Sequence, residues 1–312
     1  MSENQTHISV LFDEALDALM IHADGIYIDG TFGRGGHTRG ILSRLNEHGR
    51  VYAMDKDPAA LQCASEELKQ DQRFVIVQAS FADMKAWADK LDITGKVDGV
   101  LLDLGVSSPQ LDDPQRGFSF KADGPLDMRM DPAQGESASQ WLAHVDEQDL
   151  AVVLKNYGEE RYARRIARAI VAARQEQPIT TTLQLAEIVA AAHPAWEKGK
   201  HPATRSFQAV RIYINRELED LETCLQGIPD VLKPGGRLVV ISFHSLEDRI
   251  VKQFIHKQSQ GEQMPHDLPV MASQLSAGRL KKVGKMLQPS GREVDENVRA
   301  RSARMRIAEK VA

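Results

Sequence analysis

The sequence predicts an α/β fold: a doubly wound, Rossmann-like sheet into which an all-helical subdomain is inserted. Three observations lead to this prediction. Strand and helix patterns alternate through the first hundred residues, a glycine-rich turn follows the first strand, and between residues 109 and 205 helical patterns alone remain. Such alternation is typical of parallel sheets with helices on both faces.

Four short apolar runs predict the first strands of the sheet. They lie at 26–29, 51–54, 74–77 and 98–104, and helical patterns lie at 11–20, 37–46, 58–69 and 81–91. These helices supply the right-handed crossovers that parallel neighbours require. The run Val97–Asp103 is nearly all apolar, as expected of a strand that is buried on both faces.

The next strand pattern is distant, at 237–243, behind the turn Lys233-Pro-Gly-Gly236. A crossover helix within 206–232 is long enough to reach it. The residues left over carry helical patterns near 137–144, 147–156, 159–175 and 182–192. We therefore expect a main domain at 1–110 and 206–312, and an inserted helical substrate-recognition subdomain at 111–205.

The end of the chain is expected to return to the sheet. Ser245-Leu-Glu-Asp248 has the form of a capping box and predicts a helix over 246–257. Residues 260–290 carry little pattern and are expected to be loop. The alternation of polar and apolar residues over 301–307 predicts an edge strand.

The glycine-rich turn after the first strand predicts a nucleotide pocket. Gly30, Gly33, Gly35 and Gly36 lie where a chain leaving a strand must turn sharply and let a ligand approach the backbone. Asp55 ends the second strand, 19 residues after Gly36, close to the spacing at which an acidic residue binds ribose hydroxyls. The alternative is a tight strand-to-helix turn that binds nothing.

The acidic residue ahead of the glycines indicates which nucleotide is bound. No spacing between Gly30 and Gly40 gives the G-x-G-x-x-G of a dinucleotide site, and Asp29 precedes the turn. A carboxylate there would repel a diphosphate, but it suits a ligand that carries sulfonium and ammonium charges. The sequence therefore predicts S-adenosylmethionine as the cofactor.

Asp103 ends the fourth predicted strand and is the candidate catalytic residue. An aromatic amine has its lone pair drawn into the ring, and an acceptor that holds its protons makes the pair available for in-line attack. The Asp-Pro-Pro-aromatic sequence usual in amine methyltransferases is absent here, which leaves other acceptors open. The alternative role for Asp103 is that of a turn residue.

Composition indicates a cytoplasmic protein. The chain has 42% hydrophobic residues and a formal net charge of −5, and no apolar run is long enough to span a membrane. The first residues lack the pattern of a signal peptide. Cys63 and Cys224 show neither disulfide nor metal-ligand spacing, so we expect no metal and a reducing compartment.

Basic residues gather in two places in spite of the negative net charge. Residues 279–306 hold nine Lys or Arg against three Asp or Glu. A second cluster, spaced to share one helix face opposite the apolar Tyr162, Ile166 and Ile170, consists of Arg161, Arg164, Arg165 and Arg168. Such faces are often merely solvated, but two of them in an acidic chain favour contacts with phosphates.

Seven motifs in order along the chain resemble one known family, the bacterial 16S rRNA cytosine-N4 methyltransferases (RsmH or MraW). The motifs are His7–Ala15, Asp29–His37, Asp103–Asp112, Gly124–Arg129, Tyr157–Arg161, Arg205–Ile212 and Ser242–Arg249. The resemblance implies a class I methyltransferase sheet. It also implies methyl transfer from S-adenosylmethionine to N4 of a cytidine in the decoding region of small-subunit rRNA.

The resemblance also implies the roles of particular residues. Cofactor contacts fall to Gly35, Gly36 and His37 in the turn, Asp55 on the ribose, Phe81 against the adenine, and Asp103 and Gln110 near the methionine end. For RNA contacts we name the four arginines above with Lys198, Lys200, Arg205, the basic segment 279–306 and His244, although His244 could instead be a structural histidine. The expected partner is 16S rRNA, within the small ribosomal subunit.

Three other functions stay open at this stage. The enzyme could methylate DNA, protein glutamine or a small molecule, or the chain could be a noncatalytic RNA-binding assembly factor. Three carboxylates at three strand ends, Asp29, Asp55 and Asp103, favour an enzyme. An NAD-dependent oxidoreductase is disfavoured by the missing G-x-G-x-x-G. Dimerisation is left open by the sequence.

Overall fold

The structure is a computed structural model that describes residues 9–196, 199, 201–260 and 278–311 of the chain. It divides into two compact units. The first unit is Met1–Gly105 with Glu219–Ala312, and the second is Val106–Leu218. The chain therefore leaves the first unit just after one strand and returns by a helix.

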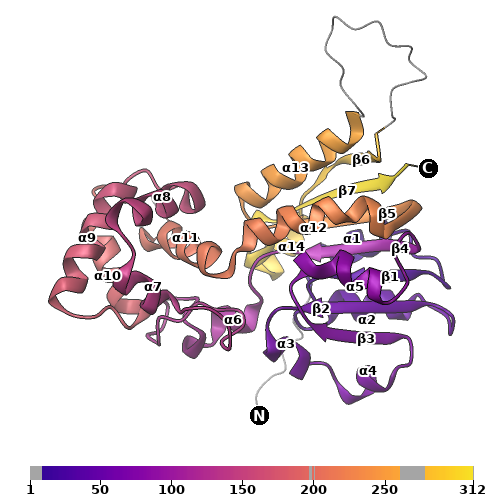
Figure 1. The fold of residues 1–312 in the computed structure, drawn as a ribbon, viewed down its shortest axis with the longest axis horizontal. Coiled ribbons are helices and arrows are strands. Elements are labelled where there is room, and N and C mark those ends of the chain that lie inside the picture. Colours follow the sequence, from indigo (N-terminus) through magenta and orange to yellow (C-terminus); the bar gives the residue numbers. More distant parts are fainter. Residues whose placement is uncertain (1–8, 197–198, 200, 261–277, 312) are drawn as a thin grey trace, which may run out of the picture. The chain divides into compact units, whose positions relative to one another are not determined.

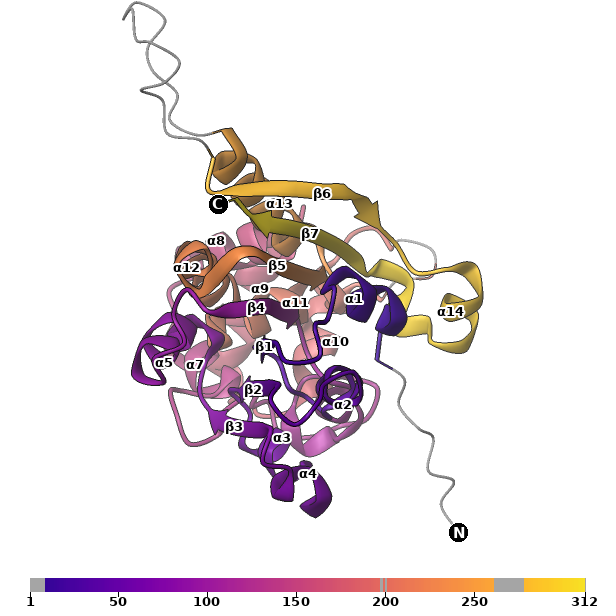
Figure 2. The same ribbon diagram turned by 90° about the vertical axis from the view of Figure 1, so that its right-hand side faces the viewer.

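A seven-stranded sheet forms the centre of the first unit, with the strand order β3-β2-β1-β4-β5-β7-β6 (Figures 1 and 2). Its strands are β1 (Ile26–Asp29), β2 (Arg50–Asp55), β3 (Phe74–Gln78), β4 (Val97–Asp103), β5 (Leu232–Ser242), β6 (Leu280–Leu287) and β7 (Arg304–Lys310). Strands β1 to β5 pair in parallel, and β7 pairs antiparallel with both β5 and β6. The predicted doubly wound, Rossmann-like fold is confirmed.

Helices cover both faces of this sheet (Figure 2). They are α1 (Phe12–Ala18), α2 (Gly36–Ser43), α3 (Pro58–Gln62), α4 (Glu66–Gln70), α5 (Met84–Lys90), α12 (Glu217–Val231), α13 (Ser245–Gln260) and α14 (Gly291–Glu296), with the 3-10 turns η1 (Phe81–Asp83) and η4 (Val298–Ser302). In the described part of the chain, every helix is too short or too polar to cross a bilayer.

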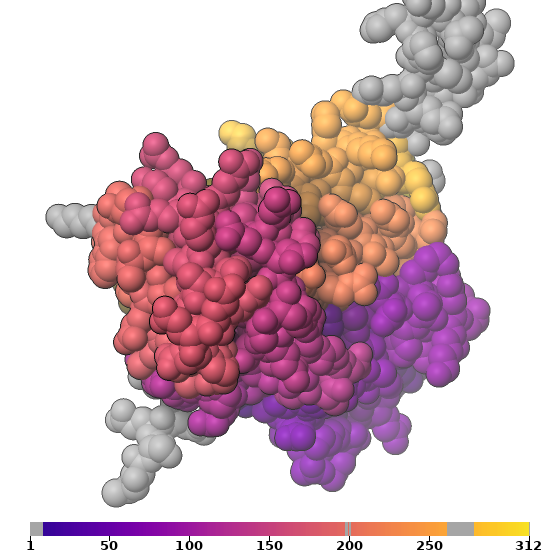
Figure 3. All heavy atoms as spheres, turned by 60° about the vertical axis from the view of Figure 1, so that its left-hand side comes forward, coloured from indigo at the N-terminus to yellow at the C-terminus, as the bar shows by residue number. Residues whose placement is uncertain are grey.

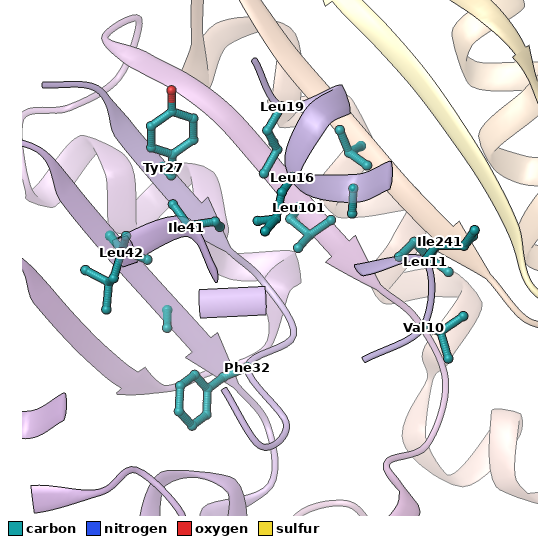
Figure 4. Close-up of a cluster of buried hydrophobic side chains, with 14 of the residues drawn as sticks. Val10, Leu11, Leu16, Leu19, Tyr27, Phe32, Ile41, Leu42, Leu101 and Ile241 are labelled. Atoms are coloured by element: carbon teal, nitrogen blue, oxygen red, sulfur yellow. The ribbon is translucent and has the colours of Figure 1, made fainter. Parts of the chain in front are cut away.

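The strands alternate their side chains between two hydrophobic cores, as the pleat requires. On β4, Leu101 packs with Tyr27 and the α1–α2 side, whereas Val100 and Leu102 belong to the cluster that contains residues of α5 and α12. Figure 4 shows the first of these cores, in which Leu101 and Ile241 come from neighbouring strands. Burial on both faces explains why the sequence of β4 reads as continuously apolar.

The second unit is a bundle of helices, which forms one continuous body in the space-filling view (Figure 3, magenta to salmon). Its helices are α6 (Ser108–Asp112), α7 (Ala138–His144), α8 (Glu147–Gly158), α9 (Ala163–Glu176), α10 (Thr182–Ala192) and α11 (Ala203–Asn215), with the 3-10 turn η2 (Pro114–Arg116). A core of its own includes Trp141, Leu150, Ile166 and Val210.

The expected single crossover helix over 206–232 is wrong. The chain forms two helices, α11 and α12, separated at Arg216, whose φ of 54° is left-handed and ends α11. Phe207 and Val210 of α11 belong to the core of the second unit. Helix α11 therefore joins the helical unit, and the units divide at 105/106 and 218/219 rather than at 110/111 and 205/206.

Two expectations for the end of the sheet are also wrong. Part of the expected loop over 260–290 is the strand β6, and β6 rather than β7 forms the edge. The reason is visible in the burial of β6: most of its side chains are exposed, so the strand needs little apolar alternation. Residues 261–277 lie outside the described residues.

Some helix ends differ from the sequence predictions, because side-chain hydrogen bonds at the helix caps set where the helices begin. The expected helix at 58–69 is split, because Ser65 caps α4 by accepting from the Leu68 amide. Helix α13 begins at Ser245, but the carboxylate that binds the preceding amides is Glu247. Asp248, the acidic residue of the supposed capping box, pairs instead with Arg306.

Replacing Leu101 by alanine tests the importance of the core beneath β4. Leu101 is fully buried, and removing its side chain leaves a cavity between strand and helices. We expect Leu101→Ala to lower the free energy of unfolding by about 2–5 kcal/mol, measured by urea denaturation. Val75→Ala on β3, where the valine is 43% exposed, serves as the control and should change it by less than about 1 kcal/mol. Equal losses would contradict the assignment of this core.

Candidate functional site

The candidate site lies where the order of the sheet reverses direction. From β1 the chain adds strands outward to β3 on one side, and then to β4 and β5 on the other. In open α/β sheets, ligands bind in the crevice beyond the carboxyl ends of the strands at this switch point. The two strands that flank it, β1 and β4, end in Asp29 and Asp103.

The turn after β1 is shaped by its glycines. Gly33 and Gly35 have φ of 55° and 72°, in the left-handed region that side chains other than glycine rarely adopt. A Cβ on Gly36 would lie 2.0 Å from the Ser9 hydroxyl oxygen, and Gly35 is the N-cap of α2. The turn therefore needs glycine for its left-handed backbone and for its close packing against Ser9, and it leads directly into the N-terminus of α2, which suits contact with a polar ligand.

Asp55, at the end of β2, is joined directly to this turn. Its Oδ2 accepts a hydrogen bond of 2.7 Å from the Gly33 amide, and Oδ1 accepts one of 2.8 Å from the Asp57 amide. Burial raises the pKa of Asp55 from 3.8 to about 6, although the two amides oppose the shift. The structure thus brings Asp55 into contact with the glycine turn, as their spacing in the sequence predicted.

Asp29 faces the interior of the protein. One of its oxygens accepts from the Thr31 amide at 3.1 Å, and the other accepts from the Thr38 hydroxyl at 2.6 Å. Burial raises the pKa of Asp29 in spite of these bonds. Asp29 therefore links the turn to α2 by hydrogen bonds. Both of its oxygens have donors, so its effect on the site is electrostatic.

Asp103 and His37 each carry a buried polar atom that has no hydrogen-bond partner among the described residues. These atoms are Asp103 Oδ1 and His37 Nε2, while Asp103 Oδ2 lies 3.8 Å from His37 Nδ1. Burial, with the charges of Asp29 and Glu247, raises the pKa of Asp103 well above its ordinary value. Burial lowers the pKa of His37 to about 4, so this imidazole is neutral at pH 7.

Two features of the site were missed by the sequence reasoning. Thr31 accepts a hydrogen bond of 2.6 Å from the Asp103 amide and so ties β4 to the glycine turn. Asp220 of α12 accepts from Lys56 at 2.9 Å and from Ser80 at 2.7 Å, just after β2 and β3. The threonine between Gly30 and Phe32 was a visible signal; Asp220 gave none, because it lies far along the chain.

Phe81 and His244 lie in the same unit. Phe81 begins η1, is half-buried, and a Cβ on Gly30 would lie 3.3 Å from its own Cβ. His244 follows β5, and its Nε2 lies 3.1 Å from Glu247 Oε1. This pair makes no hydrogen bond, and His244 Nε2 is buried without a hydrogen-bond partner among the described residues. The substrate contact of His244 therefore stays a prediction. The adenine contact of Phe81 stays a prediction.

Gln110 lies in the second unit, where it is buried. Its side-chain oxygen accepts a hydrogen bond of 2.8 Å from the Ser107 amide and completes a capping box at the start of α6. Sequence reasoning missed this helix-capping role, although the Ser-x-x-Gln spacing was a signal for it. The cofactor contact implied by the resemblance stays a prediction.

The basic residues of the second unit are only partly arranged as expected. Arg164, Arg165 and Arg168 are exposed on α9, and Ile166 and Ile170 on the same helix are fully buried. Arg161 is not on that helix, which begins at Ala163; it lies 5.7 Å from the ring centre of Tyr162. Arg205 is half-buried on α11. Lys198 and Lys200 lie outside the described residues.

The residues present in the first unit fit S-adenosylmethionine. The turn leads into the N-terminus of α2, and Asp55 offers a carboxylate. Asp103 and His37 offer buried polar atoms that lack partners among the described residues. Buried polar groups are rarely left unpaired, so these two atoms indicate ligand contacts. A cationic ligand would also offset the repulsion among the carboxylates.

Comparisons with known proteins find relatives along the whole chain. A family model described as the MraW methylase family matches residues 4–311. A Ribosomal RNA small subunit methyltransferase H from Pseudoalteromonas atlantica is 55% identical over 312 residues, 100% of either chain. A protein of the same name from Shewanella amazonensis is 57% identical, over 100% of this chain and 99% of that one. A solved putative rRNA-methylase from Clostridium thermocellum gives a TM-score of only 0.45 at 12% identity, with 98% of each chain covered.

The raised pKa of Asp55 predicts a pH dependence of stability. Between its ordinary value of 3.8 and about 6, the folded protein holds a proton on Asp55 that the unfolded chain has lost. The contribution of Asp55 to stability is therefore present below about pH 4 and is lost as the pH rises through 6. We expect Asp55→Asn to remove this fall, on the order of 2 kcal/mol.

The measurement is urea denaturation of both proteins from pH 4 to pH 7. Asp29 and Asp103 titrate in both, so the difference between the two curves isolates Asp55. Asp92→Asn, at an exposed carboxylate paired with Lys96, is the control and should leave the shape of the curve unchanged. Parallel curves for wild type and Asp55→Asn would contradict the assignment.

Proposed function

The chain belongs to the MraW methylase family, and from this membership we propose that it methylates N4 of a cytidine in the decoding region of 16S rRNA. The curated relatives are named as methyltransferases of small-subunit ribosomal RNA. The observation that carries the proposal is the buried Oδ1 of Asp103, which has no hydrogen-bond partner among the described residues and lies at the switch point of the sheet. We place the reaction in the cytoplasm.

The cofactor is S-adenosylmethionine, which supplies an activated methyl group on a sulfonium centre. Amides of the turn around Gly35 and Gly36 would hold it, Asp55 would accept from its ribose hydroxyls, and Phe81 would pack on the adenine. The neutral imidazole of His37 can donate or accept without repelling the sulfonium, since burial lowers its pKa to about 4.

Asp103 has the properties of a group that orients an amine. Its amide donates a hydrogen bond to Thr31, and its Oδ1 is available to accept a hydrogen bond from the exocyclic amine. A hydrogen bond from the amine to Asp103 would fix the orientation of the amine. Its nitrogen lone pair would then point at the methyl carbon, as direct in-line displacement requires. Ionisation of Asp103, disfavoured by burial and by Asp29 and Glu247, becomes favourable when a positive charge lies beside it.

The cysteines give no support to a covalent mechanism. Cys224 is buried in α12, where burial raises the pKa of its thiol, so little thiolate forms. Cys63 follows α3 rather than lying inside a helix as expected, and it accepts a hydrogen bond of 2.7 Å from Arg34. Neither lies at the end of a strand, so we propose a direct transfer without a covalent enzyme intermediate.

The RNA must present an unstacked cytidine, which costs a few kcal/mol. Contacts with phosphates are expected to offset that cost. Within the described residues of the second unit, Arg164 and Arg165 are exposed and in no ion pair, whereas Arg168 lies 3.7 Å from Glu147. We assign phosphate contacts to this face of α9, to Arg161 two residues before that helix, and to Arg205 on α11.

The test is a methyl-transfer assay with radiolabelled S-adenosylmethionine. Small ribosomal subunits from cells that lack this chain are the substrate, and the labelled nucleoside is mapped after nuclease digestion. Label in N4-methylated cytidine is expected. Label in another nucleoside would exclude the N4 assignment, and tight cofactor binding without incorporation into RNA would exclude rRNA methylation.

Asp103→Asn separates catalysis from cofactor binding. Asparagine keeps the size of the side chain but loses the negative charge that orients the amine. We expect kcat to fall by about 10²-fold or more, and the Kd for S-adenosylmethionine, measured by calorimetry, to stay within about threefold. Asp92→Asn should change neither. An equal loss of kcat and cofactor affinity would assign Asp103 to the cofactor instead.

Arg164→Gln with Arg165→Gln tests the basic face of α9. Each arginine that contacts a phosphate adds about 0.7–0.9 to the dependence of log affinity on log salt. The double variant should bind small-subunit RNA several-fold more weakly, with a salt slope reduced by about 1–2, in filter binding. The control removes two positive charges from exposed ion pairs of the first unit, Lys69→Gln and Lys85→Gln; similar effects of the two pairs would oppose the assignment.

A further inference from the structure

A basic groove runs between α13 and the edge strand β6 in the first unit. These two elements lie side by side in both ribbon views (Figures 1 and 2). Together with β7 they enclose a cavity of about 270 Å³. The groove lies outside the site described above, and none of its lining residues belongs to the glycine turn or to the strand ends around Asp103.

The rim of the groove is positively charged. Lys252 and His256 come from α13, and Lys282 and Lys285 come from β6. All four side chains are exposed. Within residues 9–196, 199, 201–260 and 278–311, none of the three lysines takes part in an ion pair. Arg306 also lines the groove, but Asp248 neutralises it through two hydrogen bonds.

The floor of the groove is apolar. Ile255 of α13, Val283 and Met286 of β6, and Ile307 of β7 line it, and among the described lining residues none is Asp or Glu. The groove therefore offers a surface of uncompensated positive charge over apolar side chains, in a chain whose net charge is −5. The phosphates of a polyanion match the charged rim, and the C–H faces of its sugar rings can pack on the apolar floor.

Protection of the sheet edge alone does not account for this arrangement. Lysines on an edge strand commonly prevent the pairing of strands from two molecules, and Lys282 and Lys285 could serve that purpose. Lys252, however, lies on a helix and points its charge at the same groove. Edge protection needs neither a helix lysine nor a cavity.

A peptide that adds a strand to β6 is also disfavoured. Gly284 has a φ of 62°, and the pairing of β6 with β7 shifts its register between Val283 and Leu287. Such a bulge bends the strand and interrupts the regular row of backbone groups that an added strand would use. Recognition by charge is therefore favoured over recognition by strand pairing.

We propose that this groove binds the phosphodiester backbone of RNA through Lys252, Lys282 and Lys285. The proposal rests on the proposed function, since that function supplies an RNA partner. Apart from the imidazole of His256, the described residues that line the groove carry no aromatic ring, so the groove lacks the series of aromatic side chains on which successive bases stack. It contacts phosphates and riboses, and therefore binds RNA without regard to sequence.

The experiment uses the full chain with three substitutions, Lys252→Gln, Lys282→Gln and Lys285→Gln. Affinity for small-subunit rRNA, and for an unrelated RNA of equal length, is measured by filter binding from 50 to 300 mM KCl. We expect the Kd for both RNAs to rise about tenfold or more at moderate salt, and the salt slope to fall by about 2–3. Arginine at the same three positions keeps the charge and should keep the Kd within about threefold.

The matched control removes the same charge from exposed ion pairs of the same unit, through Lys69→Gln, Lys85→Gln and Lys96→Gln. Its Kd should stay within about threefold of the wild type. A groove variant that behaves like this control overturns the proposal. So does a change confined to the sedimentation coefficient, which would identify a second copy of the chain as the occupant.

The two proposals fail separately. If the wild type binds RNA, loses affinity on substitution of the groove, but incorporates no methyl group into RNA, the groove stands and the proposed function falls. If the wild type methylates small-subunit rRNA while the groove variant keeps its Kd and salt slope, the function stands and the groove proposal falls. Thermal unfolding of each variant checks that it is folded.

Discussion

The complete burial of Asp29 and the partial burial of Asp55 and Asp103, at adjacent strand ends, are the constraint on which the rest of the site depends. Asp55, Asp29 and Asp103 end β2, β1 and β4, which are neighbours in the sheet, and burial raises the pKa of each. A buried charge costs free energy unless it is paired or hydrogen-bonded. Backbone amides stabilise the charge of Asp55, and an amide and the Thr38 hydroxyl stabilise that of Asp29. Asp103 Oδ1 has no such donor among the described residues, and the charges of Asp29 and Glu247 raise the pKa of Asp103 further. That residual cost favours a cationic ligand.

The glycine turn takes its shape from the same carboxylates. Asp55 accepts from the Gly33 amide, Asp29 accepts from Thr31 and Thr38, and Thr31 in turn accepts from the amide of Asp103. One loop is thus tied to the ends of three strands. The loop is therefore held in place by the sheet before a ligand arrives, and preorganisation of this kind lowers the entropy lost on binding. A shift of any of these bonds would move Asp103 as well as the turn.

Local patterns in the sequence were sufficient for the parallel strands, the glycine turn and Asp55, because each depends on burial or on short spacing. They failed where distant contacts decide. Strand β6 is rich in exposed lysine and forms the edge of the sheet beside β7. A search for alternating apolar residues could therefore not predict this strand. The break at Arg216 follows from the packing of α11 in the second unit, and Asp220 reaches the site through the fold alone. The roles of Phe81 and Gln110 came from the family resemblance, not from spacing.

In this acidic chain, carboxylates gather at the strand ends while exposed lysines and arginines gather elsewhere. Under the proposed function, this separation limits where RNA can be bound. The strand ends that would hold the cofactor gather carboxylates whose influence on one another is visible in the pKa of Asp103, and a phosphate backbone gains nothing there. Under the proposed function, affinity for RNA must therefore come from cationic surfaces such as Arg164 and Arg165 on α9 and the α13–β6 groove. Exposed lysine and arginine contacts weaken steeply with salt, whereas hydrogen bonds to buried groups such as Asp55 do not. Binding of RNA and binding of the cofactor should thus respond to ionic strength independently.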